Sequence, residues 1–157
     1  MKYTFGTTEE YIKAMYLSIG IYSPHQLDME TISSRLGTSL VFLPYKSMTI
    51  HDAILIDSRL SKEQQWQDFG HELCHVRWHD GNQRVMTSSY LDYQEEKATN
   101  FAYHACIPSF MVERIVLPRH EKKAIWALQE TFKVEHDFAK ERLEQYKRNR
   151  QLLEVWK

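Results

Sequence analysis

The side chains best suited to chemistry stand in five consecutive residues, His71-Glu72-Leu73-Cys74-His75. Histidines four positions apart project from one face of an α-helix, so both imidazoles can bind one metal ion. Zinc lowers the pKa of a coordinated water to about 7, and a carboxylate beside it can take up the proton and pass it to a leaving amine. The pattern predicts that His71 and His75 bind Zn²⁺ and that Glu72 is the catalytic base.

A catalytic zinc site needs a third protein ligand besides the two histidines. His79 lies about 12 Å beyond His71 along the same helix, so we expect it to act outside the coordination sphere or near the helix C-terminus, where a cation is favoured. The better candidate is Glu95, on the next long helix, where it shares one face with two alanines that allow close packing on the motif helix. Glu96 points about 100° away on the helical wheel and is the alternative ligand.

The motif requires a helix to position it, and the flanking residues predict one that starts after Ser61. Gln64 stands three positions later, which matches a capping box. An apolar stripe follows at helical spacing and faces away from the motif: Trp66, Phe69, Leu73 and Val76. We expect this helix to end near Asp80-Gly81, because glycine suits a C-terminal cap.

The rest of the chain reads as mostly helical, since it contains only five glycines and four prolines. Spacing and breakers predict helices at roughly 7–19, 27–36, 89–106, just after Pro108, 119–132 and from about 136. Residues 39–43 and 53–56 are the two expected strands, and 48–52 reads as a turn. The expected fold class is α+β, with a small sheet packed on the helical core that carries the motif. The strand 53–56 could offer an edge to an extended substrate.

Length and charge limit the remaining choices. A chain of 157 residues suggests one domain, with an N-terminal part at 1–60, metal-binding helices at 61–108 and C-terminal helices at 109–157. A net charge of −1 gives no field that recruits nucleic acid or a membrane surface, so neither is expected as a partner. Two cysteines and no apolar leader favour a reduced, cytoplasmic setting.

Further side chains near the motif have weaker claims to a role. A peptidase needs a donor for the developing oxyanion, and four side chains around the second metal helix are candidates: Tyr90, Tyr93, Tyr103 and His104. Cys74 and Cys106 are expected to pack as small apolar residues.

The segment LSKEQQWQDFGHELCHVRWH, followed by EEKATNFAYHACIP, resembles the ImmA/IrrE family of metallopeptidases. In that family the motif helix is followed by a helix patterned E-x-x-A-[ND]-x-F-A, which ends at a hydrophobic-Pro corner. The residues at the corresponding positions here are Glu95, Ala98, Thr99, Phe101, Ala102 and Ile107-Pro108. The resemblance implies Glu95 as the third ligand. Thr99 departs from the pattern at a position that could orient a bound histidine, a role open to Thr99 or Asn100.

The resemblance also implies a biological role. Its ImmA-like members cleave a helix-turn-helix repressor and so activate a phage or mobile element, which makes such a repressor the expected substrate and partner. One alternative is a non-catalytic zinc module that sequesters a repressor, which the intact Glu72 disfavours. Another is a DNA-binding protein with an incidental motif, which the balanced charge disfavours.

Overall fold

The computed structural model describes residues 6–78 and 88–155, with side chains described up to residue 150. The chain divides into two compact units, one of Met29–Tyr103 and the other of Met1–Asp28 with His104–Lys157. The expectation of one domain remains a prediction. Within the described residues, no helix has both the length and the apolar character that crossing a bilayer requires.

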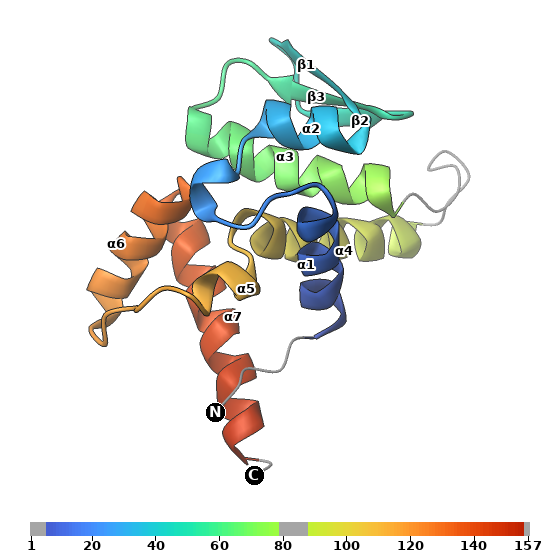
Figure 1. The fold of residues 1–157 in the computed structure, drawn as a ribbon. Helices are drawn as coiled ribbons and strands as arrows, with labels where there is room; N and C mark the ends of the chain where they lie inside the picture. Colours follow the sequence, from blue (N-terminus) through green and yellow to red (C-terminus); the bar gives the residue numbers. More distant parts are fainter. Residues whose placement is uncertain (1–5, 79–87, 156–157) are drawn as a thin grey trace. The chain divides into compact units, whose positions relative to one another are not determined.

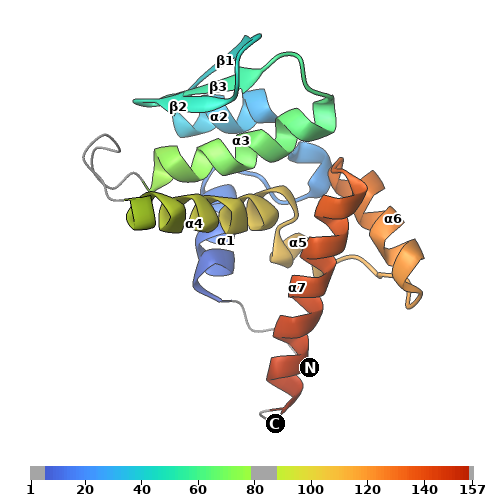
Figure 2. The same ribbon diagram turned by 180° about the vertical axis from the view of Figure 1, so that it is seen from behind.

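The unit Met29–Tyr103 consists of a small sheet and the helices beside it (Figure 1). Its elements are α2 (Met29–Leu36), β1 (Ser39–Leu43), β2 (Met48–Ile50), β3 (Ala53–Asp57), α3 (Lys62–Arg77) and most of α4 (Ser88–Cys106). The three strands are ordered β1-β3-β2. β1 runs parallel to β3, and β2 runs antiparallel to it. Helices α2 and α3 pack against this sheet, as Figure 2 also shows. The predicted α+β class, mostly helical with a small sheet, is confirmed.

Strand β2 corrects the sequence-based interpretation, which treated 48–52 as a turn. Residues Met48–Ile50 pair with β3, and the turn is confined to the two residues that follow. His51 makes this turn with a φ of 54°, in the left-handed region. β3 is the central strand with both edges paired, so the expectation that 53–56 offers an edge to a substrate is wrong. Three residues are too few for strand alternation to be visible in the sequence.

The two faces of the sheet have different surroundings. Ile54 and Ile56 of β3 are fully buried on the face covered by helices. Thr49 is paired with Ile54, and cross-strand partners share a face, so Thr49 also lies on the helix side. Its neighbours Met48 and Ile50 are exposed on the opposite face. Strand alternation therefore selects Thr49 as the β2 side chain that reaches α3.

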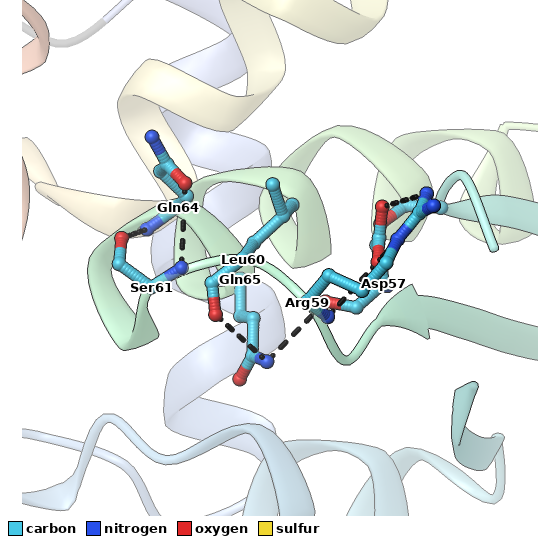
Figure 3. Close-up of polar contacts among 7 residues, drawn as sticks. Asp57, Arg59, Leu60, Ser61, Gln64 and Gln65 are labelled. Atoms are coloured by element: carbon cyan, nitrogen blue, oxygen red, sulfur yellow. Dashed lines mark hydrogen bonds and ion pairs between the residues drawn. The ribbon is translucent and has the colours of Figure 1, made fainter. Parts of the chain in front are cut away.

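The entry to α3 is held by a capping box, as the sequence predicts (Figure 3). The Ser61 hydroxyl accepts a hydrogen bond from the Gln64 backbone at 3.2 Å, and the Gln64 side chain accepts one from the Ser61 backbone at 3.3 Å. Between β3 and this cap, Arg59 forms an ion pair with Asp57 at 2.9 Å. The Gln65 amide donates to two backbone carbonyls, one at the end of β3 and one in the turn that follows. The start of the motif helix is thus defined by local contacts.

The second unit contains α1 (Thr7–Ser18), a 3-10 turn (Pro24–Gln26), the C-terminal end of α4, α5 (Ser109–Val112), α6 (Glu121–Phe132) and α7 (His136–Val155). A buried polar network joins α1, α5 and α7. The Ser109 hydroxyl donates to the Glu9 carboxylate and accepts from the Arg142 guanidinium, whose Nη2 lies 2.6 Å away. Arg142 also donates to the Ile107 carbonyl at 3.0 Å. One serine therefore links two buried side chains of opposite charge.

We expect Ser109→Ala to lower the free energy of unfolding by about 1–3 kcal/mol, because both buried partners lose the hydroxyl that they share. Urea unfolding followed by circular dichroism measures the effect. Ser34→Ala, at an exposed position of α2, is the matched control and should change stability by less than about 0.5 kcal/mol. Equal stability of the two variants would show that the network contributes nothing.

Candidate metal centre

Helix α3 places His71 and His75 one turn apart on the same side. Their ring centroids lie 5.2 Å apart, with the ring planes inclined at 65°. The orientation of the helix follows from the predicted stripe, because Trp66, Phe69 and Leu73 are buried. Neither histidine is buried to the same degree, so both imidazoles remain near the surface.

Helix α4 brings Glu95 to these histidines. Its Oε2 lies 2.8 Å from Nε2 of His71, and its Oε1 lies 3.0 Å from Nε2 of His75. One ligand atom from each of the three residues falls within 4.8 Å of the other two. The sequence allowed two glutamates as the third ligand. Among the described residues, the cluster contains Glu95 and not Glu96. His79 lies outside the described residues.

Side-chain contacts connect α4 to α3 and to Trp78 at the end of α3. The two helices lie side by side in both views (Figures 1 and 2). Ala98 and Phe101 of α4 are fully buried, and the Phe101 ring meets the Trp78 ring edge-on at 5.0 Å. The ammonium of Lys97 lies 4.6 Å from the centre of the Trp78 ring. The aromatic pair therefore connects α4 to the end of α3.

The donor set fits a zinc ion. Two imidazole nitrogens and one carboxylate oxygen are a known three-ligand set of catalytic zinc sites, and they leave a fourth position open. In the protein alone, Glu95 bridges both imidazoles, so the three donors already converge on one point. The Glu95 side chain is still 56% exposed. The centre therefore lies at the protein surface.

Glu72 has surroundings different from those of the histidines. It is only 8% exposed, although the sequence pattern placed the motif face away from the buried stripe. The β2 side of the sheet covers it, and the Thr49 hydroxyl donates to its Oε2 at 2.7 Å. Burial raises the pKa of the Glu72 carboxyl above its usual value, while the Thr49 hydrogen bond and the neighbouring imidazoles act in the opposite direction. A carboxylate with a raised pKa is a stronger base and accepts a proton more readily.

The comparison with known families agrees with this geometry. The family model of the IrrE N-terminal-like domain, peptidase M78, matches residues 25–144. The chain belongs to this family. The match includes His71, Glu72, His75 and Glu95, and it confirms the resemblance to ImmA/IrrE proteins. The family is one of metallopeptidases.

Two relatives come from Bacillus subtilis (strain 168). The chain is 38% identical over 146 residues to the phage-like element PBSX protein XkdA, and the match covers 90% of this chain and 74% of that protein. It is also 38% identical over 152 residues to the uncharacterized protein YqaB, with 94% of this chain and 88% of that protein covered. This member of the M78 family is therefore similar to both relatives over most of their length.

Thr99 departs from the ImmA/IrrE pattern, and its hydroxyl has a local partner. It donates to the Glu95 backbone carbonyl at 2.9 Å, which is a common bond for threonine within a helix. The contact connects Thr99 to the backbone of the proposed ligand rather than to an imidazole. The idea that Thr99 or Asn100 orients a histidine stays a prediction.

The structure of this M78 protein also shows the surroundings of the cysteine in the motif and of three candidate oxyanion donors. Burial raises the pKa of the Cys74 thiol to about 12, so the thiol is neutral at physiological pH, as a packing role requires. The Tyr90 and Tyr93 rings are exposed and stack with centroids 6.2 Å apart. His104 is buried in the other unit. The identity of the oxyanion donor stays a prediction. Thr49 was not predicted, because the sequence-based interpretation treated 48–52 as a turn.

Proposed function

We propose that this protein is a zinc-dependent endopeptidase that cleaves a helix-turn-helix repressor and thereby releases transcription of a phage or mobile element. The observation that carries the proposal is the convergence of His71, His75 and Glu95 beside a buried glutamate. Membership of the M78 family and similarity to a protein of a phage-like element support it. Glu72 distinguishes the site from a purely structural zinc site, which has no use for a general base.

In this mechanism the two histidines and Glu95 hold the metal, and Glu72 moves the proton. When bound, Zn²⁺ supplies a Lewis acid that polarises the scissile carbonyl and makes water more acidic. Glu72 accepts one proton from the water whose oxygen bonds to the carbonyl carbon. It then donates that proton to the nitrogen as the carbon–nitrogen bond breaks. The products are a carboxylate end and an amine end, and Glu72 returns to its starting charge.

The test is cleavage of a helix-turn-helix repressor from the genome that encodes this protein. Purified, zinc-loaded protein is incubated with the repressor, and fragments are identified by mass spectrometry. We expect one principal cleavage that a metal chelator prevents and added zinc restores. Tight binding without cleavage would instead favour a module that sequesters the repressor. If the repressor is neither cleaved nor bound, it is not the substrate.

A further inference from the structure

We propose that Thr49 is a positioning residue for the general base, and that its hydroxyl fixes one oxygen of Glu72 so that the other receives the proton from water. This inference rests on the proposed peptidase function. It concerns a side chain outside the zinc-binding motif, on a strand that the sequence did not reveal.

The hydrogen bond between Thr49 and Glu72 is well formed. The Thr49 Oγ1 atom lies 2.7 Å from Oε2 of Glu72, a distance typical of a hydroxyl donor bound to an oxygen acceptor. Among the residues whose side chains the structure describes, no second hydrogen-bond donor contacts this carboxylate. A buried carboxylate without a donor is costly. Thr49 therefore both stabilises Glu72 in place and leaves Oε1 available.

The Thr49 hydroxyl also contacts the backbone of α3 at Glu72. The same Oγ1 lies 3.2 Å from the Glu72 backbone carbonyl. A hydroxyl has a single proton, so the shorter contact to Oε2 takes the larger share of it. Because one oxygen atom contacts both ends of Glu72, rotation of that side chain away from its observed conformation would break the stronger contact.

The sheet makes this placement rigid. Pairing of β2 with β3 sets Thr49 opposite the fully buried Ile54, on the face toward α3. A shift of one residue in register would bring an apolar neighbour, Met48 or Ile50, to Glu72 instead. Threonine is also stiff at its first side-chain torsion, because it is branched at Cβ. Backbone pairing and side-chain stiffness together hold the hydroxyl at one point.

The experiment compares wild type with Thr49→Val, which keeps the shape and removes the hydroxyl, and with Thr49→Ser, which keeps the hydroxyl. Thr131→Val, on α6, controls for the same chemical change elsewhere. We measure kcat and KM for repressor cleavage, zinc affinity by chelator competition, and the Glu72 conformation in crystals of the zinc-loaded proteins. We expect Thr49→Val to lose about 10- to 100-fold in kcat with KM and zinc affinity unchanged within about threefold. Thr49→Ser and Thr131→Val should stay within about threefold of wild type.

Each outcome decides the proposal. Loss of kcat in Thr49→Val with rescue by serine, and Glu72 displaced in the crystal, supports it. An unchanged kcat, or a loss that serine does not restore, overturns it in favour of a merely structural threonine. If the wild type cleaves no repressor, the proposed function fails. The Glu72 conformation in the crystals then tests the positioning role of Thr49 separately. Glu72 in the same conformation with and without the hydroxyl would then overturn the positioning role.

Discussion

Glu72→Gln is expected to lose most of its cleavage activity while the protein still binds zinc. Glutamine keeps the size of the side chain and can still contact Thr49, but it cannot carry a proton from water to the leaving nitrogen. General acid–base catalysis contributes about 10²- to 10⁴-fold, so kcat should fall by about that factor. Zinc affinity should change little, because the three proposed ligands are untouched. Initial rates of repressor cleavage and a chelator competition assay on the same samples measure the two effects.

Glu63→Gln is the matched control, since Glu63 is an exposed residue in the first turn of the same helix. It should cleave at the wild-type rate. Turnover in Glu72→Gln at a rate comparable with that of the control would contradict the role of Glu72 as general base. Loss of zinc from Glu72→Gln would instead indicate that this side chain supports the metal site itself.

Replacing the proposed third ligand, Glu95, should strongly reduce zinc affinity. Glu95 is the residue that contacts both imidazoles, so Glu95→Ala removes one of three ligands and the bridge between the histidines. Even loss of a residue that only supports a ligand typically costs 10- to 100-fold in metal affinity. We therefore expect zinc affinity to fall by at least about 100-fold and cleavage to be lost at stoichiometric zinc. Titration against a fluorescent zinc chelator measures the affinity.

Glu96→Ala provides the control for this variant, because it removes the adjacent carboxylate of the same helix. The described residues do not place Glu96 in the cluster of potential ligands, so its removal should leave zinc affinity within about threefold of wild type. The reverse pattern, with zinc lost from Glu96→Ala and retained by Glu95→Ala, would show that the other carboxylate is the ligand.

The chemistry of the metal centre and the helices that carry it could be predicted from sequence, because their signals are local. The spacing of His71 and His75 depends only on the period of a helix, and Ser61 with Gln64 marks where that helix begins. Glu95 was reached through one helix face and a family pattern, and the structure brings it within 3.0 Å of His75. Prolines and capping residues also located most of the remaining helices.

Only the tertiary structure decided what surrounds Glu72. The burial of this carboxylate and its bond to Thr49 depend on the pairing of Met48–Ile50 with β3 and on the packing of that sheet against α3. The bond from Ser109 to Glu9 likewise joins residues 100 positions apart in the chain, and the bond from Arg142 to Ser109 joins residues 33 positions apart. A three-residue strand has no visible periodicity, and contacts between distant segments leave no local pattern in the sequence. The sequence by itself therefore determined which groups can bind the metal and move a proton, whereas long-range packing decided how the proton-accepting group is held.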